Sequence, residues 1–220
     1  FFMSKGSAIP RLAFLGRYTP GERLSGPEKA ARRIYDTVRR RTGIEAEFFT
    51  YFFDGDLSNR AMKLGGYEVD AEKGVATLGL ARMNGALSRF DPDVFVIVNF
   101  ERFTFLPLNW ARRRKLPILY LAHSIIAEEN ERLRRHAPLS MRVKDAMTER
   151  RLLEYSDKII FVSEENRKQA LRRYHVHGET AILPNGVDDV FFEGSGEEVV
   201  QVGRRIACSS PSSLCMVPAV

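Results

Sequence analysis

Short runs of hydrophobic residues alternate along the chain with longer polar segments of helical length. The runs of strand length are 11–16, 45–53, 93–99, 117–123, 158–162 and 180–183. Near-continuous apolar runs of this kind, several of them almost without polar residues, are typical of strands that are covered on both faces. We expect helices after Pro27, from Leu78 to Phe90, around Trp110, over much of 123–156, and from Glu164 to Tyr174.

This alternation predicts an α/β fold with a Rossmann-like, doubly wound parallel sheet, because parallel neighbours need crossover connections and these are almost always right-handed. Segment 55–74 is polar and punctuated by glycines, so we expect a loop there. In sheets of this type ligands bind beyond the carboxyl ends of the strands. The loops of interest are therefore those that follow Gly16, Asn99, His123, Val162 and Leu183.

The composition is that of a globular protein with one main core. The chain has 220 residues, of which 44% are hydrophobic and 28% are charged. No apolar run approaches the roughly 18 to 20 residues of a membrane span, and residues 1–6 do not resemble a secretory leader, so a cytoplasmic protein is expected. Cys208 and Cys215 have no histidine or acidic neighbours at ligand spacing, and we predict no metal site.

Basic residues outnumber acidic ones, with 34 Lys and Arg against 28 Asp and Glu, and the formal net charge is +6. The excess is clustered, which favours an anionic partner: a nucleotide phosphate, an anionic membrane leaflet or nucleic acid. Nucleic acid is the least favoured of these partners, because aromatic residues are not interleaved with the basic ones and no nucleic-acid motif occurs.

Two loops carry residues with candidate chemistry. The first ends in Leu24-Ser25-Gly26-Pro27-Glu28, where Ser25 and Gly26 precede a helix. Gly26 would let a phosphate or hydroxyl group approach the backbone, with the helix dipole favouring negative charge, although an ordinary turn accounts for the same residues. His123 ends a buried strand and is either a neutral donor to a substrate hydroxyl or a border residue satisfied within the fold. Ser163 is expected to cap the following helix.

The most distinctive stretch is SDKIIFVSEENRKQALRRY, residues 156–174, followed by AILPNGVDDVFF, residues 181–192. A strand ending in Val-Ser, a helix, and a strand running into Pro-Asn-Gly-Val-Asp resemble the end of the N-terminal domain of retaining nucleotide-sugar glycosyltransferases with the GT-B fold. These enzymes form glycosyltransferase family 4, which includes glycogen synthases and phosphatidylinositol mannosyltransferases. The resemblance covers residues 10–192, so residues 1–192 are expected to form one half of a GT-B fold.

The resemblance implies two Rossmann-like domains that face a cleft. The N-terminal domain would bind the acceptor, a glycan or a lipid-linked sugar, and the other domain most of the nucleotide sugar, with retention and with neither metal nor cofactor. Gly26 resembles the glycine that meets the donor phosphate or the transferred sugar, while Ser25 departs from the glycine usual there. His123 resembles the histidine that contacts the transferred sugar. Relatives with lipid-linked acceptors touch the membrane through a basic amphipathic region, which segment 128–151 would supply unless its apolar residues pack in the core.

Residues 193–220 are predicted to be a hinge and an incomplete start of the donor-binding domain. Residues 198–204 resemble the first strand of that domain, and Arg204 resembles the arginine that offsets diphosphate charge. Residues 207–220 hold no Lys-Gly, no charged residue and no glutamate pair, as expected of a truncated or frame-shifted chain. We therefore predict a glycosyltransferase half that is inactive alone. The alternatives are a subunit whose donor domain another chain supplies, and a non-enzymatic basic module that binds a polyanion.

Overall fold

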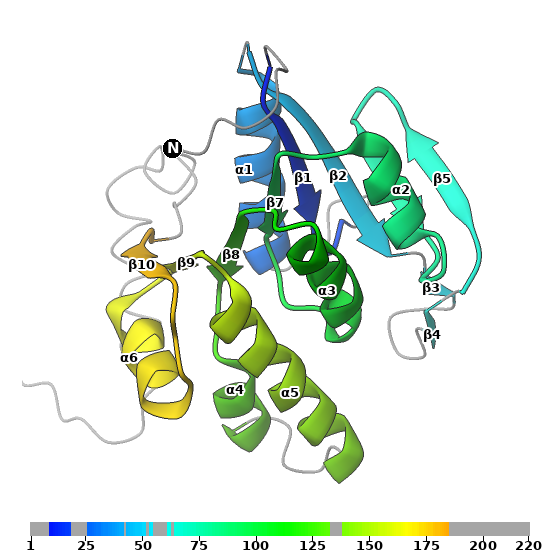
Figure 1. Ribbon diagram of the computed structural model, residues 1–220. Helices are drawn as coiled ribbons and strands as arrows, with labels where there is room; N and C mark the ends of the chain where they lie inside the picture. Colours follow the sequence, from blue (N-terminus) through cyan, green and yellow to red (C-terminus); the bar gives the residue numbers. More distant parts are fainter. Residues whose placement is uncertain are drawn as a thin grey trace, which may run out of the picture. The chain divides into compact units, whose positions relative to one another are not determined.

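The main sheet has eight strands: β1 (Arg11–Leu15), β2 (Glu45–Tyr51), β5 (Tyr67–Asp70), β6 (Val75–Leu78), β7 (Val94–Ile97), β8 (Ile118–Ala122), β9 (Lys158–Phe161) and β10 (Glu179–Ile182). Their order is β10-β9-β8-β7-β1-β2-β6-β5, and every pairing is parallel except that of β5 with β6 (Figure 1). The computed structural model describes residues 9–18, 26–41, 43–51, 53–54, 61–62, 64–132 and 138–184, within the first of two units, residues 1–184. The predicted α/β fold class is confirmed.

Helices cover both faces of this sheet. They are α1 (Gly26–Arg39), α2 (Met83–Phe90), α3 (Phe105–Arg113), α4 (Ile126–Arg132), α5 (Leu139–Tyr155) and α6 (Glu164–Arg173), with a short 3-10 helix η1 (Arg102–Thr104) before α3. In Figure 1, α1 lies behind the sheet, whereas α2 and α3 lie in front of it. A short antiparallel pair, β3 (Phe53–Asp54) and β4 (Ala61–Met62), is separate from the main sheet.

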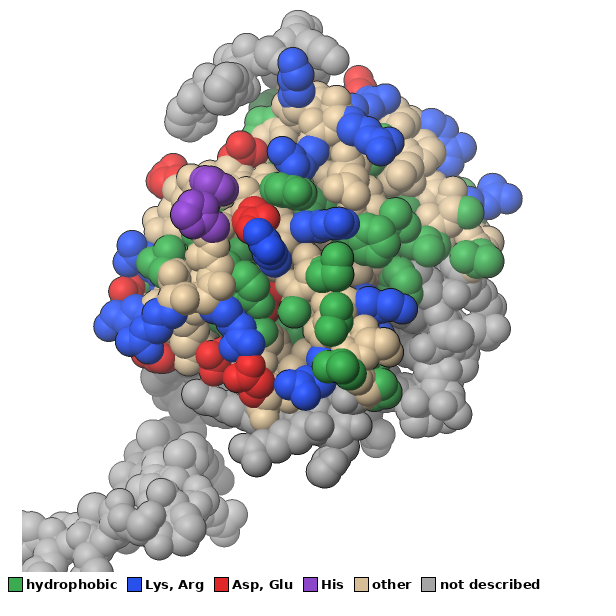
Figure 2. Space-filling view, turned by 60° about the horizontal axis from the view of Figure 1, so that its bottom comes forward, with side chains coloured by type: hydrophobic (Ala, Val, Ile, Leu, Met, Phe, Trp, Pro, Cys, Tyr) green, Lys and Arg blue, Asp and Glu red, His purple; other side chains and the backbone are tan. Residues whose placement is uncertain are grey.

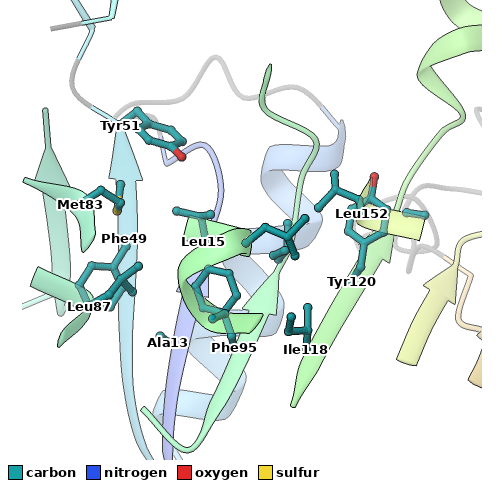
Figure 3. Close-up of a cluster of buried hydrophobic side chains, with 14 of the residues drawn as sticks. Ala13, Leu15, Phe49, Tyr51, Met83, Leu87, Phe95, Ile118, Tyr120 and Leu152 are labelled. Carbon is teal, nitrogen blue, oxygen red and sulfur yellow. The ribbon is translucent and has the colours of Figure 1, made fainter. Parts of the chain in front are cut away.

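Alternate residues of the strands supply two hydrophobic cores, one on each face of the sheet. In β1, Ala13 and Leu15 belong to the core beneath α2, α3 and α5, whereas Phe14 belongs to the core beneath α1. The larger core includes Phe95, which is fully buried (Figure 3). Because each large apolar side chain contributes roughly 1.5 to 3 kcal/mol when fully buried, this two-sided burial is what stabilises the central strands.

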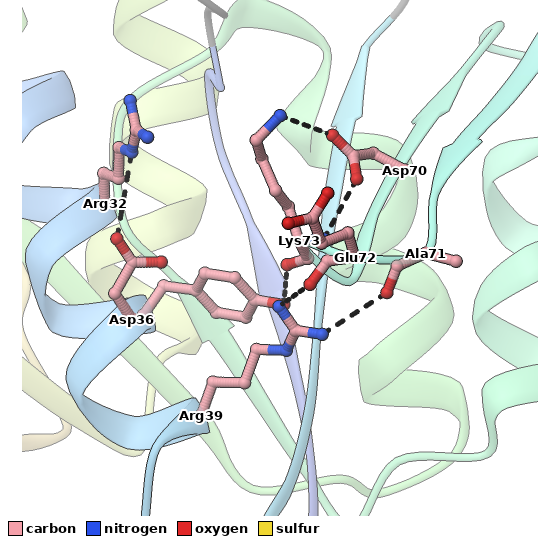
Figure 4. A network of polar contacts seen from close by, with 8 residues as sticks. Arg32, Asp36, Arg39, Asp70, Ala71, Glu72 and Lys73 are labelled. Atoms are coloured by element: carbon pink, nitrogen blue, oxygen red, sulfur yellow. Dashed lines mark hydrogen bonds and ion pairs between the residues drawn. The ribbon is translucent and has the colours of Figure 1, made fainter.

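Helix α1 is anchored to the turn between β5 and β6 by polar contacts (Figure 4). The Tyr35 hydroxyl lies 2.7 Å from the carbonyl of Gly74 and 3.0 Å from that of Lys73, and the Arg39 guanidinium donates to the carbonyl of Glu72. Asp70 accepts hydrogen bonds from both the backbone N–H and the ammonium group of Lys73, which closes the turn. These contacts hold the outer strands of the sheet against α1.

Two features of this region were predicted wrongly. Part of the expected loop 55–74 forms the edge strand β5, and the expected helix 78–90 begins only at Met83, because Val75–Leu78 form strand β6. The turn between β5 and β6 ends at Gly74, which has a φ of +61° that glycine adopts readily. β6 is only four residues long, and its pairing with β2, a partner distant in sequence, supplies the hydrogen bonds that establish it.

The connections of the sheet define a topological switch point between β1 and β7. From β1 the chain continues to β2, and on to β5 and β6, on one side, and then returns to place β7, β8, β9 and β10 successively on the other. The loops leaving β1 and β7 therefore run to opposite faces of the sheet. In open α/β sheets the ligand site lies at this point, outside the carboxyl ends of the strands.

Candidate functional site

Gly16 and Asn99 meet at the switch point. Gly16 follows β1 and Asn99 follows β7 by two residues, and the N–H of Val98 donates to the carbonyl of Leu15 at 2.9 Å. A Cβ on Gly16 would lie 2.7 Å from Val98 Cγ2 and 2.9 Å from Asn99 Oδ1, so only glycine fits without displacing its neighbours. Asn99 is buried, and its Oδ1 has no hydrogen-bond partner among the described residues. A buried unpaired amide oxygen is costly, and its presence at this place points to a ligand.

Three charged side chains bridge the same switch point. The guanidinium of Arg17, in the loop after β1, lies 2.8 Å from the carboxylate of Glu101, which follows β7, and 3.6 Å from that of Glu28 in the first turn of α1. Both carboxylates are nearly buried, with side-chain exposures of 10% for Glu28 and 11% for Glu101, whereas that of Arg17 is 40%. We call Arg17, Glu28 and Glu101 the switch-point triad.

The segment that carries Glu101 is fixed by side chains from two other elements. The hydroxyl of Tyr51 on β2 donates to the carbonyl of Phe103 at 3.0 Å, and the hydroxyl of Thr148 on α5 donates to the carbonyl of Arg102 at 3.1 Å. Burial, together with the negative charge of Glu101, raises the pKa of Tyr51, so its hydroxyl remains a donor at neutral pH.

The guanidinium of Arg102 completes this anchoring by a two-pronged contact with Asp145 of α5, at 2.6 and 3.2 Å. Asp145 is almost fully buried and also accepts a hydrogen bond from Asn130 of α4. Paired contacts of this geometry restrict orientation as well as position. The backbone between Asn99 and Thr104 is therefore held against both the sheet and α5.

His123 lies directly after β8, at the predicted edge of the sheet, and is partly buried. Its carbonyl accepts a hydrogen bond from Asn166 Nδ2 at 2.9 Å, and the N–H of Asn166 donates to Ser163 Oγ at 3.1 Å. The predicted capping of α6 by Ser163 is confirmed. Asn166 thus ties the backbone of His123 to the beginning of α6.

Glu149 on α5 holds the segment that follows His123. Its carboxylate accepts hydrogen bonds from the backbone N–H groups of Ile126 and Ala127, at the beginning of α4, and from the hydroxyl of Tyr174 at 2.6 Å. Burial raises the pKa of Glu149, while these three donors and the nearby Arg173 oppose the rise. The hydrogen bonds to Ile126 and Ala127 fix α4 relative to α5. They thereby also fix the direction of the chain after His123.

Of the other predicted site residues, the structure describes one, Gly26, and does not describe Ser25 or Arg204. Gly26 is the first residue of α1 and is exposed, and apart from its chain neighbours and the backbone of its own helix no described atom lies within 4 Å of where a Cβ would stand. Over the described part of the chain, no three His, Cys, Asp or Glu side chains gather as a closed metal site would require. Sequence reasoning marked the loops after Gly16 and Asn99 but did not single out Asn99, Arg17 or Glu101, which the structure brings together at the switch point.

Segment 128–151 is divided by the structure between the core and the surface. Asp145, Thr148 and Glu149 of α5 face inward. Leu139, Val143 and Met147, spaced four residues apart on the same helix, are 73%, 47% and 53% exposed. The alternative that the apolar residues of this segment pack in the core is therefore wrong for these three. We call Leu139, Val143 and Met147 the α5 stripe.

Basic side chains accompany the α5 stripe, but they do not merge into one large patch. Lys144 and Arg150 are exposed on the same helix, and the Arg150 guanidinium pairs with Glu154 at 2.6 Å. On the face seen in Figure 2, Lys and Arg side chains are scattered among hydrophobic and acidic ones. None of the helices in the described ranges is long and apolar enough to cross a membrane.

Comparisons with known proteins give a family and a fold for this chain. The model of Glycosyltransferase Family 4 matches residues 25–191. Sucrose-phosphate synthase from Thermosynechococcus elongatus aligns with a TM-score of 0.57 at 14% identity, over 88% of this chain and 52% of that one. Anabaena Alr3699/HepE in complex with UDP aligns with a TM-score of 0.54 at 14% identity, over 90% of this chain and 50% of that one.

A further structure, UDP-GlcNAc 2-epimerase from Neisseria meningitidis bound to UDP-GlcNAc, aligns with a TM-score of 0.50 at 12% identity, over 92% of this chain and 53% of that one. At such identities these structures share the fold with this chain. The chain spans about half the length of each of the three. A comparison with curated protein sequences gives no match.

Proposed function

Since the chain belongs to Glycosyltransferase Family 4, we propose that it is the acceptor-side half of a GT-B enzyme that transfers a sugar from a nucleotide sugar, with retention, to a glycan or a lipid-linked acceptor. The observation that carries this proposal is the family match over residues 25–191, which contains the carboxyl-edge residues Gly26, Asn99, Glu101 and His123. UDP in the HepE structure and UDP-GlcNAc in the epimerase structure support a nucleotide sugar as the donor.

Each residue at the carboxyl edge has a role in this proposal. The backbone of Gly26 at the beginning of α1 meets the donor phosphate or the transferred sugar, where helix N–H groups favour negative charge. His123 contacts the transferred sugar, with its backbone held by Asn166. The switch-point triad and Asn99 lie where the acceptor enters.

The chain alone is proposed to be inactive for an electrostatic reason. As the sugar leaves, negative charge develops on the nucleotide diphosphate, and transfer requires cations placed to offset it. Arg17, the cation described at the switch point, is already paired with Glu28 and Glu101. The compensating charge must therefore come from elsewhere, and Arg204 is the candidate by resemblance.

The test is a transfer assay with radiolabelled UDP-, GDP- and ADP-sugars, run on the chain alone and on the chain extended through the coding sequence that follows residue 220. We expect transfer by the extended chain only. Transfer by the 220-residue chain would contradict the need for a second half. A folded extended chain that carries the Lys-Gly and glutamate-pair pattern, yet transfers no sugar from any donor, would contradict the proposed activity.

We also propose that the α5 stripe places the enzyme peripherally on the inner face of an anionic membrane. Leu139, Val143 and Met147 present apolar surface along one line of the helix, and Lys144 lies beside them. Apolar side chains next to basic ones are the combination by which a surface helix binds anionic lipid. This location suits a lipid-linked acceptor.

A further inference from the structure

We infer that His175 and His177 form a surface site for a divalent transition-metal ion such as Zn²⁺ or Cu²⁺. The two histidines lie on the segment that connects α6 to β10. This segment enters β10 at the amino end of the strand, whereas Asn99 and His123 follow the carboxyl ends of β7 and β8. The site therefore lies at the other edge of the parallel sheet and goes beyond the proposed function.

Both histidine side chains project from the same side of this segment. The backbone is already extended at Tyr174, with a φ of −129° and a ψ of 153°. Tyr174 and Val176 pack against the larger core, whereas His175 and His177 are exposed. Alternate residues of an extended chain point to opposite sides, so residues two apart share a side. In a helix the same spacing would separate the two imidazoles.

The two imidazole rings stand at the separation that one metal ion requires. Their centroids are 4.8 Å apart and their planes make an angle of 77°. Zn–N bonds of roughly 2.0 to 2.1 Å, at an N–Zn–N angle of about 90° to 110°, place two ring centroids about 4.5 to 5.2 Å apart. Figure 2 shows the two histidine side chains, in purple, next to each other on the surface. Rotation of these exposed rings is enough to direct one nitrogen of each toward a shared ion.

The backbone that carries the histidines is held at both ends. The hydroxyl of Tyr174 donates to the carboxylate of Glu149 at 2.6 Å, and the N–H of Glu179 donates to the carbonyl of Asp157 at 2.9 Å. An ion that binds between the rings therefore has to order two side chains but no loop. Such preorganisation lowers the entropic cost of binding.

The chemistry of the two ligands selects the class of ion. Imidazole nitrogen suits Zn²⁺, Cu²⁺ and Ni²⁺, with Cu²⁺ bound most tightly, whereas Mg²⁺ and Ca²⁺ prefer oxygen ligands. No third His, Cys, Asp or Glu side chain joins the pair among the described residues. Water therefore completes the coordination, and the site is open, unlike the closed sites that three or four protein ligands form.

The competing explanation is that the rings make only an aromatic contact, since edge-to-face pairs are favourable by themselves. Each imidazole would then bind metal independently, with two weak equivalent sites per chain, and removal of one ring would leave the affinity of the other unchanged. Two ligands on one ion instead give a single site, and its affinity falls when either ring is removed. Stoichiometry and the effect of single substitutions distinguish the two explanations.

The experiment is calorimetric titration of the 220-residue chain with ZnCl₂ in neutral buffer without chelators, with MgCl₂ in parallel. Cys208 and Cys215 are replaced by Ser throughout, because thiols also bind Zn²⁺. We expect one Zn²⁺ per chain and no binding of Mg²⁺. His175→Asn or His177→Asn should each weaken Zn²⁺ binding about tenfold or more, and the double variant little further.

The matched control is His136→Asn, which removes a histidine elsewhere in the chain and should leave the affinity unchanged. A second measurement needs no histidine variant: bound Cu²⁺ should broaden the amide NMR signals of residues 174–179 first. The site is excluded if no Zn²⁺ binds, if either single variant keeps the affinity, if His136→Asn weakens binding equally, or if Cu²⁺ broadens only signals elsewhere. The proposed sugar transfer requires no metal, so failure of either proposal leaves the other standing.

Discussion

Gly16 and Asn99 are packed so closely that a Cβ on the glycine would stand 2.9 Å from the amide oxygen of the asparagine and 2.7 Å from Val98 Cγ2. Gly16→Ala should therefore lower the free energy of unfolding by about 1 to 3 kcal/mol, the usual cost of overpacking. Gly26→Ala is the matched control, because apart from its chain neighbours and its own helix backbone no described atom lies within 4 Å of its Cβ position. Its stability should be unchanged or higher by up to about 1 kcal/mol. Urea unfolding of both variants is the measurement, and equal losses would contradict the packing described.

The contact between Arg102 and Asp145 should be asymmetric in its energetics. Arg102→Met leaves the carboxylate of Asp145, which is 1% exposed, without its cation, and should cost about 3 to 5 kcal/mol. Asp145→Asn leaves a guanidinium that is 31% exposed and able to reach water, so its cost should be smaller. Chemical unfolding of both variants measures how much free energy of unfolding each one loses. A larger loss for Asp145→Asn than for Arg102→Met would contradict this prediction.

Glu149 should make stability depend on pH. Burial raises its pKa above the ordinary value of 4.5, so the folded state favours the protonated carboxyl group. The stabilisation is fully present below the unfolded pKa and is lost as the pH rises through the higher folded one. The free energy of unfolding of the wild type should therefore fall relative to that of Glu149→Gln as the pH rises from about 4 toward neutrality.

Urea titrations at several pH values measure this difference. Glu165→Gln, which removes an exposed carboxyl group on α6, is the control for a surface substitution. Tyr174, Tyr120 and Arg173 are the other ionisable groups that interact with Glu149. If the difference in free energy of unfolding between the wild type and Glu149→Gln did not change with pH, burial of this carboxyl group would have no effect on its titration.

The α5 stripe should bind anionic lipid. We expect the chain to sediment with phosphatidylcholine vesicles that contain phosphatidylserine and to remain in solution without it. Replacing Val143 and Met147 with Ser should reduce binding about tenfold or more, since each buried apolar side chain contributes up to roughly 1.5 to 3 kcal/mol. Leu171→Ser on α6, also an exposed leucine, should have no effect. Binding that is indifferent to lipid charge, or equally reduced by Leu171→Ser, would eliminate the membrane proposal.

The central strands were predictable because they are buried on both faces. Val94–Ile97, Ile118–Ala122 and Lys158–Phe161 lie within the apolar runs that indicated them. β5 was missed because an edge strand needs no such run: Tyr67, Glu68 and Val69 are all exposed, and the strand is defined by its antiparallel pairing with β6. β6 has buried residues, but a hydrophobic pattern of only four residues does not distinguish a strand from the beginning of a helix.

The local sequence determined the alternation of strands and helices, the cap at Ser163 and the family, since each depends on residues that are neighbours in the chain. The site depended on contacts between distant segments. Arg17 meets Glu101 across more than eighty residues, and Gly16 meets Asn99 across a similar distance. Only the order of the strands, which places β1 beside β7, brings these residues together. Hydrogen bonds between β1 and β7 and the packing of helices on both faces establish that order. The pattern of hydrophobic and polar residues along the sequence shows neither the pairing of these strands nor the packing of these helices.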